Sequence, residues 1–153
     1  GAVDAAQLMA NSAKKAGIDI EVIREPNDGY WSNVWNNDAK GWCACYWGGR
    51  PAETMMFSAA YVAESKWNDT MWKTTDSAVK FNQLVKDARK ELDESKKRDI
   101  LYECQRLIYD DGGLLCPLFN SYVSANSKKI AHGKIAANWD SDGAKCVERW
   151  WFA

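Results

Sequence analysis

The feature that most constrains the fold is an apolar run that ends abruptly at two glycines. Residues 42–47 read Trp-Cys-Ala-Cys-Tyr-Trp. Because this run is too short for a buried helix and is rich in aromatic residues, it predicts a strand buried on both faces. Gly48 and Gly49 end the strand, since glycine adopts positive φ and lets another molecule approach the backbone. Arg50 then offers a planar cation, and Pro51 suits the first turn of a helix.

A buried strand that stops at glycines and leads into a helix is typical of the place where open α/β sheets hold their ligands. The same residues also fit a core strand followed by an ordinary βα turn. The stretch 41–54 alone does not decide between these two interpretations.

The composition narrows the classes of partner. The 153 residues are enough for one domain with a hydrophobic core. Lys and Arg total 20 against 21 Asp and Glu, so neither nucleic acid nor an acidic membrane surface is an expected partner. Nine tryptophans are unusual; they suit sugar, peptide or aromatic ligands, or they fill the core.

The cysteines leave three interpretations open: buried thiols, one disulfide or a metal site. The five are Cys43, Cys45, Cys104, Cys116 and Cys146. Cys43 and Cys45 would lie on one face of a strand, too far apart for an easy disulfide. Cys104 and Cys116 could be neighbours on a helix and the next strand. Cys-x-Cys with one histidine, His132, is poor zinc spacing, so no metal is expected.

Periodicity predicts the elements of the first half in order. A helix over 2–16 ends at Gly17, and alternating residues 18–23 predict a strand with one buried face. Asn27 or Asp28 caps a short helix that carries Tyr30, Trp31, Val34 and Trp35. There follow a turn at 36–38, the strand 42–47, a helix over 51–60 and an irregular surface loop over 61–75. The missing strand before the first helix predicts that the chain starts within a fold.

The second half is dominated by two helical patterns. Ala78, Phe81, Leu84, Val85, Ala88 and Leu92 form the apolar stripe of a helix capped by Asp76 or Ser77. Ser95 caps the next helix, whose stripe is Ile100, Leu101, Cys104, Leu107 and Ile108 and which stops at Gly112-Gly113. The short link predicts an antiparallel pair. The rest of the chain is predicted to contain an edge strand over 114–123, a turn over 139–143 and an aromatic terminus over 148–152. Another part of the protein is expected to cover this terminus, because three aromatic residues rarely stay in water.

No catalytic motif is present. The sequence lacks a phosphate-binding Gly-x-x-x-x-Gly-Lys loop, a Gly-x-Ser-x-Gly elbow and a His-Glu-x-x-His pair. His132 lies in Ala-His-Gly and is expected to be exposed or to support other residues. Asp110-Asp111 is interpreted as a pair of solvated charges. Asp140 and Asp142 lack the downstream glutamate of a calcium-binding loop. The chain is therefore not expected to be an enzyme.

The order of the pieces resembles a known family. Four pieces carry the resemblance. They are the buried strand ending Tyr46-Trp47-Gly48-Gly49-Arg50-Pro51, the helical pair with Glu91-Leu92-Asp93-Glu94-Ser95-Lys96-Lys97-Arg98, the glycines Gly112-Gly113, and the segment Leu114-Leu115-Cys116-Pro117-Leu118-Phe119. Together they resemble the C-terminal part of bacterial extracellular solute-binding proteins of the dipeptide, oligopeptide and nickel class, family 5, which serve ABC importers. The resemblance covers residues 3–153.

This resemblance implies an α/β fold, a periplasmic-binding-protein type II lobe with a small mixed sheet flanked by helices. Family members have two lobes that close on a ligand, so residues 1–153 would be a C-terminal lobe fragment, with about 124–153 returning toward the first lobe. The resemblance also implies a protein that is periplasmic, or lipid-anchored outside the cytoplasmic membrane. It would capture a peptide or related small solute for a membrane permease, without a cofactor and without enzymatic activity.

The resemblance also implies a ligand site. Tyr46, Trp47, Gly48, Gly49 and Arg50 match the family's strand end that lines the ligand cleft, and Tyr30 or Trp31 matches an aromatic position that reaches it. Peptide-binding members carry an aspartate soon after the tryptophan, where this chain has Gly49-Arg50. Arg50 would prefer a carboxylate or phosphate. Glu53 is the remaining candidate to pair with a ligand ammonium group.

Two other functional classes fit parts of the sequence. An independent Trp-rich module that binds carbohydrate would need a complete site and a planar row of exposed aromatic rings. A small thiol-redox protein would need a reactive thiolate at Cys43 or Cys45. If the chain is one lobe of a larger fold, its uncovered surface predicts a homodimer or strand exchange.

Overall fold

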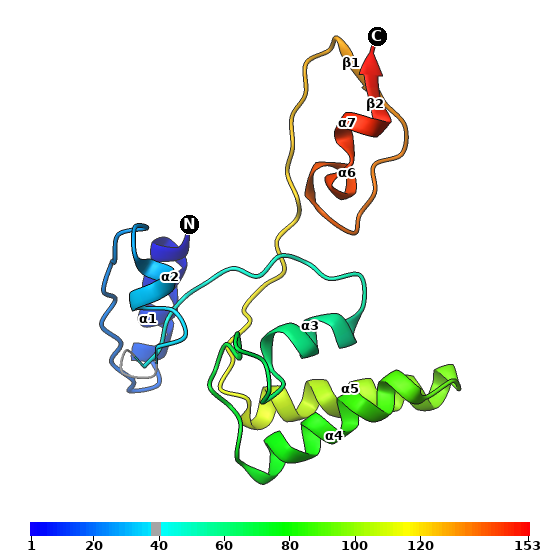
Figure 1. Cartoon of the computed structure of the whole chain (residues 1–153). Coiled ribbons are helices and arrows are strands. Elements are labelled where there is room, and N and C mark those ends of the chain that lie inside the picture. The colour runs from blue at the N-terminus through cyan, green and yellow to red at the C-terminus, as the bar shows by residue number, and fades with distance from the viewer. Residues whose placement is uncertain (38–40) are drawn as a thin grey trace. The chain divides into compact units, whose positions relative to one another are not determined.

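The computed structural model describes residues 1–37 and 41–153 and divides the chain into two compact units, Gly1–Trp47 and Gly48–Ala153 (Figure 1). The first unit holds α1 (Ala2–Lys14) and α2 (Tyr30–Asn33). The second holds α3 (Glu53–Ala60), α4 (Asp76–Lys90), α5 (Glu94–Asp111), β1 (Ile130–His132), α6 (Asp140–Ala144), α7 (Cys146–Arg149) and β2 (Trp150–Phe152). The described residues thus combine helices with a small sheet, which agrees with the expected α/β class, but this sheet is antiparallel and not mixed.

The end of α1 is confirmed at Gly17. The N–H of Ile18 donates to the carbonyl of Ala13 over 3.1 Å, and the N–H of Gly17 donates to that of Lys14 over 3.0 Å. This is the Schellman pattern, which places a left-handed residue after the helix. Gly17 adopts φ +77°, a conformation that glycine takes without steric cost.

The short aromatic helix α2 forms, but the predicted cap is wrong. Neither Asn27 nor Asp28 caps it with its side chain; Gly29, at φ +77°, is the N-cap residue. The helix begins there because the N–H groups of Ser32 and Asn33 both donate to the Gly29 carbonyl. In the turn predicted over 36–38, Asn36 has φ +56°, while Asp38 lies outside the described residues.

The strands predicted over 18–23, 42–47 and 114–123 are wrong. All three segments are outside regular secondary structure, because none meets a second strand with which to form a hydrogen-bonded ladder in the described part of the chain. Nor is 42–47 buried on both faces. Trp42 and Tyr46 are exposed, while Cys43, Cys45 and Trp47 are half-buried, so the segment alternates like a chain with one covered side.

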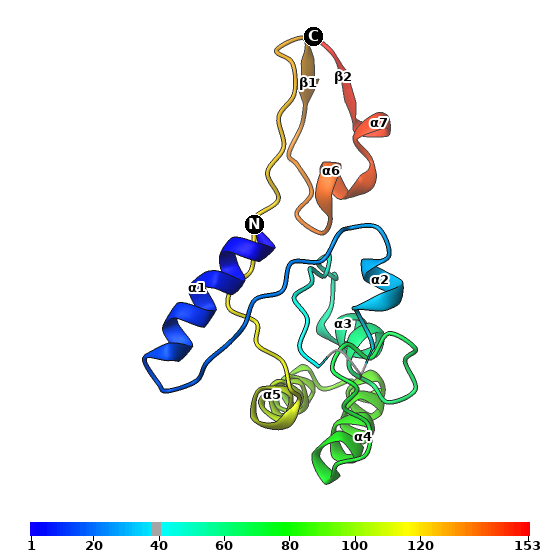
Figure 2. The ribbon, with the colours of Figure 1, turned by 90° about the vertical axis from the view of Figure 1, so that its left-hand side faces the viewer.

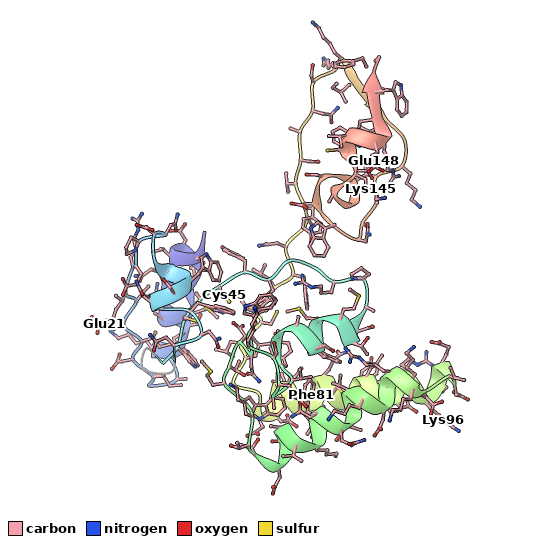
Figure 3. The ribbon with its side chains drawn as sticks, in the orientation of Figure 1. Glu21, Cys45, Phe81, Lys96, Lys145 and Glu148 are labelled. Atoms are coloured by element: carbon pink, nitrogen blue, oxygen red, sulfur yellow. The ribbon has the colours of Figure 1, made fainter. Side chains whose placement is uncertain are left out.

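The core of the second unit lies where α3, α4 and α5 come together. α4 and α5 run side by side in opposite directions (Figure 1, Figure 2), which confirms the predicted antiparallel pair. Phe81 of α4 is fully buried and packs edge-to-face on Phe57 of α3, with ring centroids 5.5 Å apart (Figure 3). Trp72 covers its other side at 5.2 Å. Leu92, predicted to be buried, is 91% exposed because α4 ends at Lys90.

The caps of both helices differ from prediction by one or two residues. Thr75, not Asp76 or Ser77, caps α4 and accepts from the N–H of Ala78. Asp93, not Ser95, caps α5 and accepts from the N–H groups of the second and third helical residues. Both cap residues have an extended backbone and a side-chain oxygen that reaches back to the first turn, as helix N-caps require.

Asp110 and Asp111 are both exposed, as predicted for a pair of solvated charges, and Asp111 also has partners within the fold. At the end of α5 its carboxylate accepts hydrogen bonds from the Ser77 hydroxyl, the Thr75 hydroxyl at 2.8 Å and the Trp72 indole N–H at 2.8 Å. These donors, led by Ser77, lower the pKa of Asp111. The carboxylate therefore joins the end of α5 to the start of α4, whose N-terminal dipole favours a negative charge.

The loop over 61–75 is irregular as predicted, but it is not a surface loop. Tyr61, Asn68 and Trp72 are all buried. The Asn68 amide donates to the carbonyl groups of Tyr61, Val62 and Trp72, and its oxygen accepts from the Trp72 N–H at 3.1 Å. A buried side chain thus supplies the hydrogen bonds that a helix or sheet would otherwise provide.

The C-terminal segment forms the two-stranded sheet of the described residues. β1 and β2 pair antiparallel with Ile130 opposite Phe152 and His132 opposite Trp150 (Figure 2). His132 is therefore in a strand rather than in the predicted loop, and its ring lies 5.1 Å from that of Trp150. Trp151 and Phe152 remain 54% and 85% exposed. The covering predicted for this aromatic end is therefore not supplied by the described residues.

Replacing Phe81 tests the helical core. Phe81→Ala should lower the free energy of unfolding by about 3–5 kcal/mol, because it removes a fully buried ring and leaves a cavity. Urea denaturation followed by tryptophan fluorescence measures the change. The matched control is Leu92→Ala, at an exposed position, which should change stability by less than about 0.5 kcal/mol. Equal losses in the two variants would contradict the described packing.

Asp111 should make the second unit more stable above about pH 4 than below it. A carboxyl group whose pKa is lowered by folding adds stability above its unfolded pKa, about 3.9, and loses it as the pH falls through the folded pKa. Asp111→Asn should therefore unfold at lower urea at pH 7 and lose less stability on acidification. Asp99→Asn, which removes an exposed carboxylate from the same helix, is the matched control and should unfold at the wild-type urea concentration at pH 7. An unchanged acid limb in Asp111→Asn would refute this role.

Candidate functional site

Four aromatic rings form a continuous cluster in the first unit. Trp31 packs between Tyr30, at 5.7 Å, and Trp35, at 5.6 Å, and Trp35 reaches Trp47 at 6.2 Å. The Tyr30 hydroxyl donates to the carbonyl of Ala44 over 2.7 Å. Helix α2 thus holds one side of the segment 42–47, and this explains why that segment has a covered side without a neighbouring strand.

The geometry of this aromatic cluster is edge-to-face. Successive ring planes meet at 83°, 70° and 62°, which is the packing that aromatic quadrupoles favour. Trp31 is 60% exposed and Tyr46 is 63% exposed. The four clustered rings join α2 to Trp47, but they do not form a flat row on which a sugar ring would stack.

The residues from Gly48 to Arg50 form a corner in the second unit. The N–H of Gly49 donates to the hydroxyl of Tyr122 over 3.0 Å. Nη1 of Arg50 donates to the carbonyl of Gly48 over 2.6 Å and to that of Gly49 over 3.3 Å. The guanidinium lies 5.2 Å from the ring centroid of Trp139, within the range of a cation–π contact. The corner therefore fixes the orientation of one cation.

At this corner Gly49 allows a close approach to its backbone, and neither glycine has a positive φ. A Cβ on Gly49 would lie 3.0 Å from the Tyr122 hydroxyl oxygen, and one on Gly48 would lie 3.5 Å from Nη1 of Arg50. Neither residue has a left-handed backbone, so the predicted turn with positive φ is wrong at this position. The group that approaches the Gly49 backbone is the Tyr122 hydroxyl of the chain itself, and the predicted approach of another molecule stays a prediction.

Trp139 precedes α6, which is an unusual left-handed turn rather than a regular helix and is anchored by Asp142. Ser141, Asp142, Gly143 and Ala144 all have φ between +49° and +72°, a left-handed run that costs energy in L-residues. The buried Asp142 carboxylate accepts from the N–H of Ala136 at 2.6 Å and from the Trp150 indole at 2.9 Å.

Asp142 also forms an ion pair with Arg149 at 3.0 Å. The backbone hydrogen bond from Ala136 is the main cause of its lowered pKa, and the Trp150 hydrogen bond and Arg149 add to it. Nearby, Lys145 and Glu148 lie 3.7 Å apart (Figure 3). The hydrogen bond between Ala136 and Asp142 links the backbone on either side of Trp139.

The predicted site residues fall into two groups. Tyr30, Trp31, Tyr46 and Trp47 belong to the first unit, whereas Gly48, Gly49, Arg50 and Glu53 belong to the second. Within the first, Tyr30, Trp31 and Trp47 share the aromatic cluster. Within the second, Gly48, Gly49 and Arg50 share the corner, and Glu53 is an exposed residue of the first turn of α3.

Sequence reasoning missed Tyr122 and Trp139 as members of the corner. They lie more than 70 residues from Gly49 and Arg50, and no local pattern reports such a separation. The only available signal was that each is a large aromatic residue in a segment without helical periodicity.

Cys104, Cys116 and His132 have three different environments. Cys104 is buried in α5 without a disulfide, and burial together with Glu103 raises the pKa of its thiol to about 11. Cys116 is exposed, with its sulfur 3.7 Å from the carbonyl of Leu118. Nδ1 of His132 lies 2.9 Å from the Gly133 carbonyl. Across the described ranges, no three His, Cys, Asp or Glu side chains gather in a way that could hold a metal ion.

Comparisons of the chain with protein-family models, curated proteins and solved structures found no match. None of the helices in the described part of the chain combines the length and the apolar character needed to cross a membrane.

Burial should make Cys104 much less reactive than Cys116. The thiolate is the nucleophile, and a pKa of about 11 leaves little thiolate at Cys104 at pH 8. Iodoacetamide followed by peptide mass mapping should label Cys116 within minutes and Cys104 only after denaturation. The unfolded chain supplies the control, because both thiols should then react at similar rates. Labelling of Cys104 as fast as Cys116 in the native chain would contradict its burial.

Proposed function

We propose that this chain is the C-terminal lobe of a solute-binding protein that captures a small peptide or carboxylate-bearing solute for an ABC importer. In this proposal its fold is a type II lobe of the periplasmic-binding-protein class, and residues 124–153 return toward a first lobe. The protein works outside the cytoplasmic membrane, delivers its ligand to a membrane permease and catalyses no reaction.

The observation that carries the proposal is the corner at Gly48–Arg50. The resemblance of the sequence to the solute-binding family indicates these residues as the ligand-contacting end of the lobe. In the structure the same residues meet Tyr122 and Trp139, so a cation, an aromatic face and a hydroxyl group converge from three distant segments. Convergent polar groups beside aromatic walls are typical of small-molecule sites.

The chemistry of the corner favours a carboxylate. Trp139 and the backbone carbonyl groups orient the Arg50 guanidinium, and an oriented guanidinium binds carboxylates through paired hydrogen bonds. The family's usual aspartate for a ligand ammonium group is absent. The proposal therefore assigns Arg50 to the ligand's carboxylate and keeps Glu53, at the start of α3, as the candidate ammonium partner.

The antiparallel pair of α4 and α5 gives secondary support. The resemblance rests in part on the sequence around Glu91–Arg98 and on Gly112-Gly113, and these residues form the link and the end of the pair. By contrast, the alternative of a carbohydrate-binding module calls for a planar aromatic row, and the cluster around Trp31 and Trp35 has tilted rings. The importer role is therefore the better supported of the two.

A peptide titration of the 153-residue chain tests the proposal. Because one lobe supplies only part of the closed site, trialanine should bind weakly, with a dissociation constant of about 1 mM. Excess trialanine should raise the melting temperature, since a ligand that binds only the folded state stabilises it. C-terminally amidated trialanine, which lacks the carboxylate, should have little effect.

The controls separate the role of Arg50 from general charge. Arg50→Ala should abolish stabilisation by trialanine, whereas Arg98→Ala, which removes an exposed arginine from α5, should preserve it. Equal stabilisation of all three proteins would remove Arg50 from the site. If neither trialanine nor its amide stabilises the wild-type chain at ~10 mM, about ten times the expected dissociation constant, the peptide-binding proposal is contradicted.

A further inference from the structure

A cavity separate from the corner lies between α3, α4 and the loop that joins them. Its volume is about 360 Å³, within the roughly 300–1,000 Å³ typical of small-molecule sites. Val62, half-buried, and Val85, buried, supply its apolar lining. The cavity belongs entirely to the second unit and is lined by residues 58–89.

Three polar side chains of the cavity wall already have partners within the fold. Ser58, Ser65 and Asn82 each donate a hydrogen bond to a backbone carbonyl group, at 2.6, 2.6 and 2.9 Å. The Asn82 oxygen also accepts from the N–H of Ala63 at 2.9 Å. Because these polar groups already have hydrogen-bond partners in the fold, the charged residues of the cavity are the better candidates to bind a ligand.

Among the charged residues that line the cavity, Arg89 is the cation without a carboxylate partner. Nη2 of its guanidinium donates to the Ser58 hydroxyl oxygen. Among residues 1–37 and 41–153, no carboxylate forms an ion pair with Arg89. Because Ser58 accepts from only one of the five guanidinium N–H groups, the others are available to a ligand.

The second cation of the cavity is already neutralised. Lys86 lies 3.5 Å from the carboxylate of Glu64, and both residues line the cavity. A backbone hydrogen bond, followed by Lys86, lowers the pKa of Glu64, which is therefore ionised at neutral pH. The cavity consequently carries one net positive charge, which comes from Arg89.

We propose that this cavity binds a small carboxylate with an apolar body, with its carboxylate on Arg89 and its apolar part against Val62 and Val85. A guanidinium matches a carboxylate through two parallel hydrogen bonds. One net positive charge balances a monoanion, whereas a phosphate dianion would keep an uncompensated charge. The apolar lining adds affinity by removing the ligand body from water.

Sodium benzoate is a suitable probe, and benzamide is its uncharged counterpart. In methyl-detected NMR of the 153-residue chain at pH 7, benzoate should produce saturable shifts at the methyl groups of Val62 and Val85. Benzamide should produce none, because it lacks the charge that Arg89 recognises. Inorganic phosphate should bind more weakly than benzoate.

Two variants of α4 isolate Arg89. Arg89→Gln should weaken benzoate binding by about tenfold or more, since hydrogen bonds to charged groups are among the strongest in proteins. Lys90→Gln removes the same charge from the neighbouring exposed residue, which does not line the cavity, and should bind as the wild type. Arg89→Lys keeps the charge but loses the planar fork, so its affinity should be intermediate.

Four results would overturn the proposal. They are the absence of saturable shifts with benzoate, unchanged affinity in Arg89→Gln, equal weakening in Arg89→Gln and Lys90→Gln, and tighter binding of phosphate than of benzoate. Amide shift dispersion of each variant verifies that it is folded. Arg50→Ala should bind benzoate in this cavity normally, and this separates the present proposal from the role assigned to Arg50.

Discussion

The buried side chain of Asn68 is the constraint on which the second unit depends. The loop from residue 61 to residue 75 contains no helix or strand, yet parts of it lie in the core. Asn68 is 1% exposed and bonds to the backbone at Tyr61, Val62 and Trp72. Buried polar groups left without partners cost about 1–3 kcal/mol each. The Asn68 amide therefore satisfies several backbone groups that the loop would otherwise bury without partners.

The position of Trp72 links this loop to the helices. Its ring covers Phe81 in the core, and its indole N–H donates to Asp111 at the end of α5. The same loop begins with Val62 and Ser65, which line the cavity beside Arg89. The corner at Gly48–Arg50 precedes α3, whose Phe57 packs on Phe81. Both proposed ligand sites therefore adjoin segments that this core holds in place.

Sequence patterns predict this chain well where local interactions decide the structure. The stripe of Ala78, Phe81, Val85 and Ala88 identifies the buried face of α4, because helical periodicity is local, and Gly17 ends α1 for the same reason. The three predicted strands fail because a strand needs a partner, which local sequence does not supply. Of the candidate site, the sequence indicates Gly48–Arg50. It does not indicate Tyr122, Trp139 or Arg89, whose roles arise from long-range contacts.

Native-state amide hydrogen exchange at Trp72 tests the central structural claim most directly. The Trp72 N–H donates to the buried Asn68 oxygen, so it should exchange as slowly as the central amides of α4, through opening of the whole helical core. The amide of Phe119, whose side chain is 95% exposed, supplies the fast reference. Exchange of Trp72 as fast as Phe119, while α4 remains protected, would show that the loop is not part of the core.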